Sequence, residues 1–490
     1  MSDLWHKSAA ELADALAAGD ASSVEITQAL IERCRAVDEK LHLFLQPTYE
    51  RALEAAKVSD ERRAGGAPAS RFDGVPVGYK DVFVTADVTT TSGSKILAGW
   101  VPPYDATVVE RCSAAGLPML GKLNMDEFAM GSSTENSGFG PTRNPWDLDR
   151  VPGGSSGGST AAVAAGAMPW AWGTETGGSV RQPAALCGLV GVKPTYGLVS
   201  RYGLIAFASS LDQAGPIART VTDAAVLLQM AAGHDRYDAT SHPSEVPDYL
   251  DGIDGGIAGM RIGVVKEFEA GGSQPGVTTR VREAYDRLEK LGAKIEEVSL
   301  PSFEHGIPCY YLIAPAEASA NLARFDGVRY GHRAAGDDIV KMTSRTRDEG
   351  FGAEVKRRIM LGTYALSAGY YDAYYGKAQK VRTLIIRDLE RVYADVDLVV
   401  CPTSPTTAFK LGERTDDPLA MYLSDIFTVP VNLAGNAAIS VPCGLSPDDG
   451  LPVGLQIMAP ALDEKTMFRA AYAFEQDFGW ITSSESRPNL

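Results

Sequence analysis

Two glycine- and serine-rich stretches decide how this chain is expected to fold: Gly153-Gly154-Ser155-Ser156-Gly157-Gly158-Ser159 and Thr176-Gly177-Gly178-Ser179-Val180-Arg181-Gln182-Pro183-Ala184. The small residues 160–167 between them predict a short helix, and residues 168–173 predict a strand. A helix of about nine residues advances roughly 13 Å, and a strand of about five returns roughly 16 Å. Ser155 and Ser179 are therefore expected to meet at one end of a sheet, where open α/β folds hold their active sites.

Three common glycine-rich motifs fit these stretches less well. A Gly/Ser heptamer standing alone is often a flexible linker, but a second glycine-rich serine loop after an ordered helix–strand pattern argues against one. A P-loop requires Lys before the Ser or Thr that follows its second glycine, and here Ser159 follows Gly158 directly. The Gly-x-Ser-x-Gly motif of α/β-hydrolases is also excluded, because the second glycine is missing after Ser179.

Composition indicates an ordinary globular protein of 490 residues, 45% apolar and 22% charged. The formal charge of −16 makes a broad nucleic-acid-binding surface on this chain improbable, so any RNA is expected to be held by a partner. The six cysteines are scattered without a Cys-x-x-Cys pair, which favours reduced, packed thiols over a zinc site or disulfide framework. We predict a cytoplasmic protein with no metal site, no secretory signal at the N-terminus and no membrane span.

The alternation of strands and helices predicts an α/β fold with a mixed central β-sheet covered by helices on both faces. We expect one domain over 1–490. It would open with N-terminal helices in 1–60 and continue as a core over 65–235 that contains both serine loops. A mainly helical cap or insertion is expected over 300–395, after which 396–490 would return to the sheet.

Amide hydrolysis would need a nucleophile, a base and donors for the oxyanion. None of the six histidines lies in or beside the serine loops, so a Ser-His-Asp triad would require distant contacts. Lys80 is the better candidate base because it lies within an apolar run, where burial would lower its pKa. The neighbouring Asp81 should point to the opposite strand face and act as a structural hydrogen-bond acceptor.

Together with the upstream Lys80-Asp81, the two loops resemble the amidase signature family, whose members use a Ser-cisSer-Lys triad. The resemblance covers most of residues 70–230 and implies that fold. It implies that Ser179 is the nucleophile, that Ser155 relays its proton from a cis peptide after Gly154, and that Lys80 is the base. The oxyanion hole would be formed by the backbone N–H groups of Thr176, Gly177 and Gly178. Arg181 is expected to form a structural ion pair.

Within that family, further runs are similar to the branch that hydrolyses glutamine to convert Glu-tRNA(Gln), Asp-tRNA(Asn) or both into Gln-tRNA(Gln) and Asn-tRNA(Asn): Gly121–Asn136, Arg201–Gly203, Ala208–Gln213, Arg324–Gly327 and Lys356–Ile359. The resemblance implies that Arg358 binds the carboxylate of glutamine and Asp425 its ammonium group. Tyr310 and Met130 are expected to line the same pocket. A guanidinium fork fits a carboxylate well. Of the three basic residues at 356–358, two are expected on a solvated helix face.

The same resemblance implies a heterotrimer with B and C subunits, in which ammonia travels to B. The partner would use ATP and Mg²⁺ and would bind most of the tRNA, leaving no cofactor on this chain. Two rival hypotheses are a stand-alone amidase of broad substrate range and a catalytically idle scaffold. Three residues depart from the family pattern, and they concern pocket detail more than chemistry: Tyr79, Glu175 and Ala437.

Overall fold

The structure, a computed structural model, describes residues 4–269, 272–483, 486–488 and 490. Residues 1–3, where a leader peptide would begin, lie outside the described residues. Among those described, the strands form one sheet in the order β1-β3-β2-β4-β6-β5-β10-β11-β9-β7-β8. Their bounds are β1 Phe44–Pro47, β2 Val77–Lys80, β3 Met119–Leu123, β4 Trp170–Glu175, β5 Val190–Lys193, β6 Gln213–Ala218, β7 Arg261–Val265, β8 Lys294–Val298, β9 Leu398–Pro402, β10 Ala437–Leu445 and β11 Pro452–Ala459.

The sheet is mixed. Strand β2 is parallel to β3 and β4, and β7 is parallel to β8 and β9, whereas the central strands from β4 through β6, β5, β10 and β11 to β9 pair in antiparallel fashion. The α-helices are α1 Ala9–Ala18, α2 Ser23–Leu41, α3 Tyr49–Ala64, α4 Thr107–Ala114, α5 Gly157–Ala164, α6 Arg181–Cys187, α7 Val221–Ala231, α8 Lys266–Glu269, α9 Pro275–Lys290, α10 Gly306–Asn321, α11 Ile339–Gly350, α12 Ala353–Ala365, α13 Lys377–Tyr393, α14 Pro418–Tyr422, α15 Val429–Ala434 and α16 Glu464–Phe478.

Helices cover both faces of the sheet because alternate residues of each buried strand point to opposite sides. Leu455 and Ile457 of β11 pack in the apolar cluster that contains the inward face of α16. Gln456, between them, points to the other face and accepts a hydrogen bond from Arg181 at the start of α6. The predicted α/β class with a mixed, two-sided sheet is confirmed.

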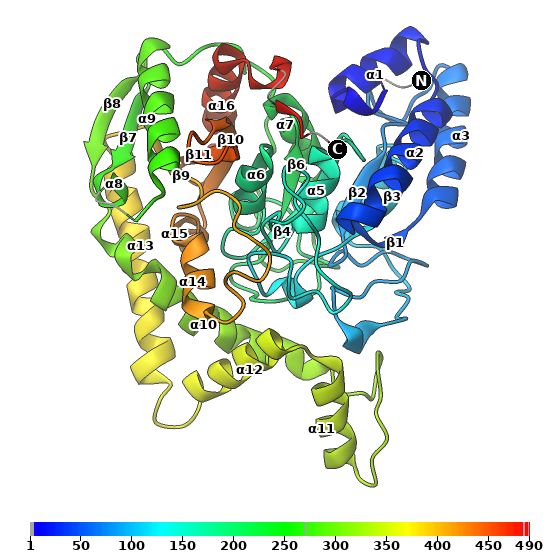
Figure 1. Cartoon of the computed structure of the whole chain (residues 1–490), viewed down its shortest axis with the longest axis vertical. Helices are drawn as coiled ribbons and strands as arrows, with labels where there is room; N and C mark the ends of the chain where they lie inside the picture. Colours follow the sequence, from blue (N-terminus) through cyan, green and yellow to red (C-terminus); the bar gives the residue numbers. More distant parts are fainter. Residues whose placement is uncertain (1–3, 270–271, 484–485, 489) are drawn as a thin grey trace.

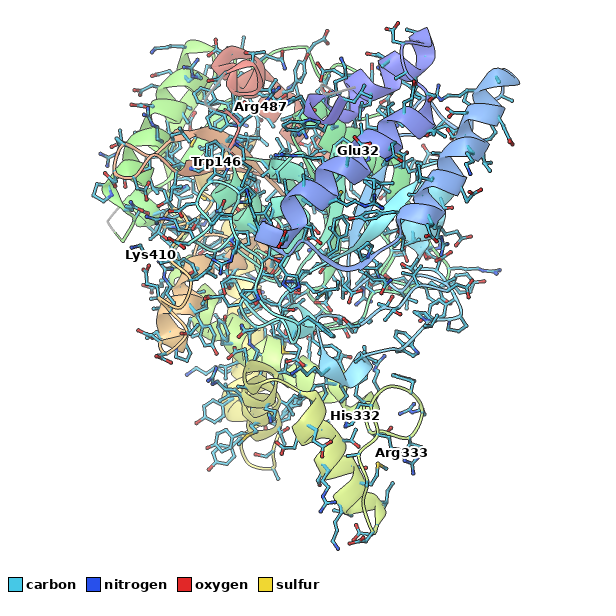
Figure 2. All side chains as sticks on the ribbon, turned by 45° about the vertical axis from the view of Figure 1, so that its right-hand side comes forward. Glu32, Trp146, His332, Arg333, Lys410 and Arg487 are labelled. Atoms are coloured by element: carbon cyan, nitrogen blue, oxygen red, sulfur yellow. The ribbon has the colours of Figure 1, made fainter. Side chains whose placement is uncertain are left out.

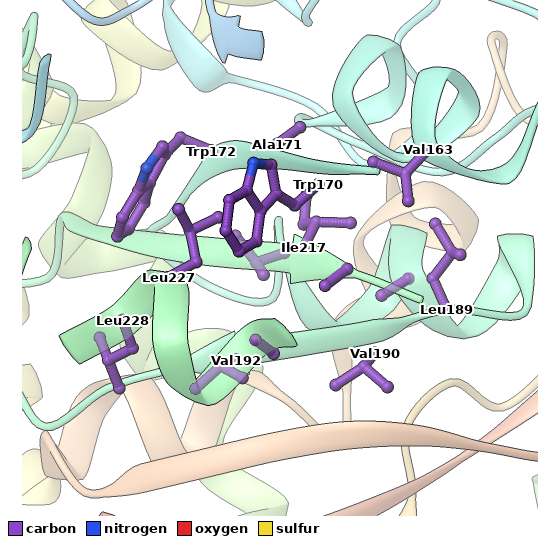
Figure 3. Close-up of a cluster of buried hydrophobic side chains, with 14 of the residues drawn as sticks. Val163, Trp170, Ala171, Trp172, Leu189, Val190, Val192, Ile217, Leu227 and Leu228 are labelled. Carbon is purple, nitrogen blue, oxygen red and sulfur yellow. The ribbon is translucent and has the colours of Figure 1, made fainter. Parts of the chain in front are cut away.

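The centre of the core lies on β4, β5 and β6. Trp170 and Trp172 of β4 are fully buried and lie beside Ile217 of β6, with Leu227 and Leu228 of α7 packed nearby (Figure 3). The helix and strand expected between the serine loops are α5 and β4. This rigid unit fixes the positions at which the two loops leave the sheet.

The helical segment expected over 300–395 contains α10, α11, α12 and α13. In Figure 1 it extends along and below one end of the sheet, with α11 and α12 forming an arm at the bottom of the view. The strands after it, β9 to β11, return to the centre of the sheet, where β10 pairs with β5.

The helix start signals in the sequence form two capping boxes. The side chains of Ser8 and Ser22 accept hydrogen bonds from the backbone N–H groups of Glu11 and Glu25, whose carboxylates accept in return from the serine N–H groups. All six cysteines are buried, as predicted.

Candidate active site

Lys80, the last residue of β2, places its amine inside the protein. The fully buried side chain donates from Nζ to Ser155 Oγ at 2.7 Å, Ser156 Oγ at 2.9 Å and the carbonyl oxygen of Thr174 at 3.2 Å. Burial lowers the pKa of Lys80 to about 7, although nearby carboxylates oppose the shift. An amine with such a pKa is partly neutral near pH 7 and can accept a proton.

Ser155 lies on the loop before α5, and the Gly154–Ser155 peptide is cis, as the family resemblance implies. The loop is held by Asp126, whose backbone N–H donates to the carbonyl oxygen of Ser155 at 3.3 Å. The Asp126 carboxylate accepts from the N–H groups of Thr134 at 2.8 Å and Asn136 at 3.0 Å. It also leaves no room at position 154, where a Cβ would lie 2.2 Å from its Oδ2. Glycine is therefore required before Ser155.

Ser179 lies between the end of β4 and the start of α6, and it keeps 8% of its surface exposed, whereas Ser155 and Lys80 keep none. Within the described part of the chain, the backbone N–H groups of Thr176, Gly177 and Gly178 have no hydrogen-bond acceptor. Unpaired N–H groups beside a serine hydroxyl are the arrangement that stabilises an oxyanion.

The loop around Ser179 is fixed by the buried ion pair between Glu175 and Arg181. Glu175 Oε2 accepts from the N–H groups of Val180 and Arg181, each at 3.0 Å. Arg181 also donates to the carbonyl oxygen of Thr428 at 3.0 Å. The structural role predicted for Arg181 is confirmed, and Glu175, one of the departures from the family pattern, is its partner.

The two serine loops are linked by Gln182. Its Oε1 accepts from the N–H of Gly154 at 3.1 Å, and its Nε2 donates to the carbonyl oxygen of Ser132 at 3.0 Å. The structure thus brings Lys80 and Ser155 into direct contact. The loops that carry Ser155 and Ser179 are joined through Gln182, and the described interactions include no hydrogen bond between the two serine hydroxyls.

Asp425 presents an unpaired carboxylate oxygen beside the loop that carries Ser179. Its Oδ2 accepts from Ser132 Oγ at 2.5 Å, while the buried Oδ1 has no partner and would lie 3.1 Å from a Cβ at Gly178. Burial raises the pKa of Asp425 to about 7, and the hydrogen bond from Ser132 opposes that rise. A buried, half-satisfied carboxylate is suited to bind a cationic group.

Arg358 reaches the same region from α12. The side chain is 2% exposed, donates from Nε to Glu354 Oε1 at 2.7 Å, and lies over the rings of Tyr311 and Tyr422. Burial alone would lower the pKa of Arg358, but Tyr311 and the Glu354 carboxylate reverse the effect, so the pKa lies above its usual value. The guanidinium therefore stays charged.

Tyr310 and Met130 complete the predicted set. The ring of Tyr310 would lie 2.9 Å from a Cβ at Gly177, so glycine is required at that position, and the hydroxyl interacts with Arg358. Met130 is fully buried in the same apolar cluster as Tyr310, and its carbonyl oxygen accepts from Asn136 Nδ2 at 3.3 Å. Of the two other basic residues of α12, Arg357 is exposed as expected, whereas Lys356 is half-buried and its amine pairs with Asp348.

Asp81, which was expected to be a structural hydrogen-bond acceptor, has that role in the structure. Asp81 accepts from the backbone N–H and the hydroxyl of Thr91, at 2.8 Å and 2.5 Å, and pairs with the buried Lys122 at 3.3 Å. The other two departures from the family pattern are buried: Tyr79 packs against Phe83, and Ala437 begins β10.

No described histidine hydrogen-bonds either serine loop. His332, for example, lies on the lower arm near Arg333 in Figure 2 and contacts Glu349 at 2.9 Å. Among the described residues, no group of three or more His, Cys, Asp or Glu side chains is arranged to hold a metal ion. In the same residues no helix is both long and apolar enough to cross a membrane.

Several residues of the site were not predicted from the sequence, namely Ser132, Gln182, Glu354 and Thr428. Gln182 lies within the second motif, three residues after Ser179, so a polar side chain at that position was a signal that could have been used. Ser132 and Thr428 carry no such signal. They reach Asp425 and the carbonyl oxygen of Gly177 only because the chain brings together segments that are 293 and 251 residues apart.

The family model named Amidase matches residues 25–468, and the chain belongs to this family. Among curated relatives, it is 61% identical over 480 residues to the A subunit of glutamyl-tRNA(Gln) amidotransferase from Thermobifida fusca (strain YX), covering 97% of this chain and 96% of the relative. The corresponding protein of Streptomyces coelicolor (strain ATCC BAA-471 / A3(2) / M145), which has the same name, is 58% identical over 483 residues, covering 98% and 97% of the two chains.

Solved structures show the same fold. A crystal structure of the A subunit of glutamyl-tRNA(Gln) amidotransferase from Thermotoga maritima is 46% identical with a TM-score of 0.78, covering 95% of this chain and 93% of that one. A 6-aminohexanoate cyclic dimer hydrolase has a higher TM-score, 0.87, at 28% identity, covering 100% of this chain and 99% of that one. The fold is thus shared by relatives with other names. Sequence identity, and not backbone similarity, distinguishes the amidotransferase subunit from the hydrolase.

Proposed function

We propose that this chain is the glutaminase subunit of a tRNA-dependent amidotransferase, which hydrolyses glutamine to supply ammonia for the conversion of Glu-tRNA(Gln), Asp-tRNA(Asn) or both. The observation that carries the proposal is the pair of buried charges beside Ser179. Asp425 offers an unpaired carboxylate oxygen for an α-ammonium group, and Arg358 a guanidinium for an α-carboxylate. A broad-range amidase has no need for both.

In the proposed reaction, Ser179 Oγ attacks the side-chain amide carbon of glutamine. Neutral Lys80 takes a proton from Ser155, which takes the proton of Ser179. The N–H groups of Thr176, Gly177 and Gly178 stabilise the oxyanion. Proton return to the leaving nitrogen releases ammonia, and water then hydrolyses the glutamyl ester on Ser179.

Tyr310 and Met130 shape the pocket. Tyr310 packs against the oxyanion loop at Gly177 and contacts Arg358, so it holds the two ends of the substrate site at a fixed separation. The side chain of Met130 contributes apolar surface from the same cluster.

We further propose that the chain acts with B and C subunits, that the ammonia it releases is used at the B subunit, and that tRNA, ATP and Mg²⁺ bind mainly there. The names of the full-length relatives support this division, because they describe the A subunit of such an enzyme. The net charge of −16 also disfavours tRNA binding by this chain.

The test is to measure glutamine hydrolysis by the isolated chain, and then with its B and C subunits and Glu-tRNA(Gln). Strong activation by the partners is expected. Partner-independent hydrolysis of simple aliphatic amides, unaffected by Arg358→Ala, would identify a stand-alone amidase instead. The absence of any acyl-enzyme under all conditions would identify an inactive scaffold.

A further inference from the structure

Helix α12 has two faces of opposite character. One face packs against α10, and there a Cβ at Gly362 would lie 1.8 Å from the carbonyl oxygen of Pro315, so the two helices are in close contact. Arg358 lies on this buried face and points to the candidate active site. On the outer face, Met360 is 72% exposed and Leu361 46%. Two large aliphatic side chains are thus left in water within one turn of a substrate-binding residue.

The apolar outer face continues beyond the end of α12. Tyr364, one turn after Met360, is 51% exposed, and its ring centroid lies 4.7 Å from that of Tyr370 and 6.0 Å from that of Tyr374. Tyr370 and Tyr374 are themselves 5.7 Å apart. We define Met360, Leu361, Tyr364, Tyr370 and Tyr374 as the α12 patch. It lies on the lower part of the molecule in Figure 1, on helices that extend away from the sheet.

The segment that carries the α12 patch differs in charge from the chain as a whole. Residues 353–393 contain eight Lys and Arg against four Asp and Glu, although the whole chain carries −16. Exposed Arg357 lies on α12, and exposed Lys377 and Lys380 follow Tyr374 at three-residue spacing, which places them on the same helical face. An apolar centre with a basic rim complements a surface that has an apolar centre and a rim of Asp and Glu.

The composition of the α12 patch favours a protein over a nucleic acid as its partner. Tyr, Met and Arg are enriched in protein–protein interfaces, and exposed tyrosines supply large contact areas at low entropic cost. Met360 and Leu361, the aliphatic part, gain nothing from contact with phosphates. Their burial against another apolar surface removes them from water.

We propose that the α12 patch is the surface on which another subunit of the amidotransferase docks, through a face with an apolar centre and an acidic rim. This inference rests on the proposed function. Because Arg358 shares α12 with Met360, Leu361 and Tyr364 of the patch, a partner docked there also fixes the position of the carboxylate-binding guanidinium. Docking therefore aligns the partner with the glutamine pocket.

The experiment uses the full-length chain co-expressed with the B and C subunits of the same organism. Met360→Glu and Leu361→Glu place a charge in the apolar centre of the patch, where docking would have to bury it without a partner, and both positions are exposed and helical, so Glu is tolerated in the free chain. Val58→Glu is the matched control, because Val58 is 47% exposed on α3, which lies at the opposite end of the molecule in Figure 1. Affinity for the companion subunits is measured by titration, and basal glutamine hydrolysis is measured on each isolated chain.

Each patch variant is expected to weaken assembly by at least about tenfold, while basal hydrolysis stays within about twofold of wild type. The Val58→Glu chain should assemble normally. If the wild-type chain assembles and the patch variants bind the companion subunits as tightly as it does, the inference is overturned and the proposed function stays intact. Failure of the wild-type chain to bind the companion subunits would overturn both. If the isolated wild-type chain binds labelled tRNA and the Met360→Glu chain does not, the patch binds nucleic acid, and the inference is also overturned.

Discussion

Replacing Asp425 with Asn tests the glutamine site directly. In the structure Oδ2 accepts from Ser132 Oγ at 2.5 Å and the buried Oδ1 has no partner. Asn has nearly the same shape and keeps an oxygen for Ser132, but it turns a neutral N–H donor toward the position of the ammonium group. Loss of one member of a buried charge pair costs about 2–4 kcal/mol, so the KM for glutamine should rise about 30- to 1,000-fold.

Steady-state hydrolysis should show this rise in KM with kcat within about threefold of wild type, because Asp425 acts on the bound ground state and transition state alike. A matched substrate distinguishes loss of ammonium binding from a general loss of activity. The monoamide of glutaric acid lacks the ammonium group, and its kcat/KM should be the same in both proteins. An unchanged KM for glutamine, or an equal loss on both substrates, would refute the assignment of the ammonium site to Asp425.

The stability of the same variant provides an independent check. Burial raises the pKa of Asp425 to about 7, above the value of an unfolded carboxyl, so the folded protein binds the proton more tightly. Stability therefore falls as pH rises from about 4 to about 7. Above pH 7 the ionised side chain costs folding free energy, on the order of a few kcal/mol. Asp425→Asn should then raise the Tm at pH 8 and leave it nearly unchanged at pH 4. A lower Tm at pH 8 would contradict the reasoning.

Three further outcomes are expected. The kcat/KM of wild type for propionamide, which lacks both charged groups, should fall about tenfold per pH unit below pH 7, because protonated Lys80 cannot accept a proton; a flat profile would argue against Lys80 as the base. Arg358→Lys should raise the KM for glutamine about tenfold or more, since Lys lacks the planar fork, and should leave propionamide kinetics alone. Gln182→Leu should lower kcat for propionamide about tenfold or more by releasing Gly154, and an unchanged kcat would remove Gln182 from the positioning of Ser155.

The parts of the fold that sequence could predict are those whose signals are local. The capping boxes at Ser8 and Ser22, the helix and strand between the serine loops, and the unit formed by β7, α9 and β8 can all be predicted within a few residues. Strands β5 and β6 were missed, as was α6. Because β5 and β6 are buried on both faces, they lack the alternation that reveals a strand.

For the candidate site, sequence supplied the residue types and the structure supplied their contacts. The position of Lys80 within an apolar run predicted its burial, and its lowered pKa follows from that burial. The support of Asp425 by Ser132 could not be predicted, because the two residues are 293 positions apart and neither carries a periodic signal. Sequence spacing predicts which residues are neighbours within one motif, as for Gln182 and Ser179. The other contacts of the site depend on which strands and loops the fold brings side by side.

The two titratable groups that the proposed reaction needs are tuned by one physical cause. Exclusion of water disfavours charge, so it lowers the pKa of the Lys80 amine and raises that of the Asp425 carboxyl until both lie near 7. Lys80 must be neutral to accept a proton, whereas Asp425 must be charged to bind an ammonium group. Both requirements are met on the alkaline side of pH 7, so acid removes glutamine binding and general-base catalysis together. Glutamine bound at Asp425 supplies the missing positive charge and lowers the pKa of that carboxyl, so the acid limb of kcat should report Lys80 alone, whereas that of kcat/KM should report both groups and be steeper.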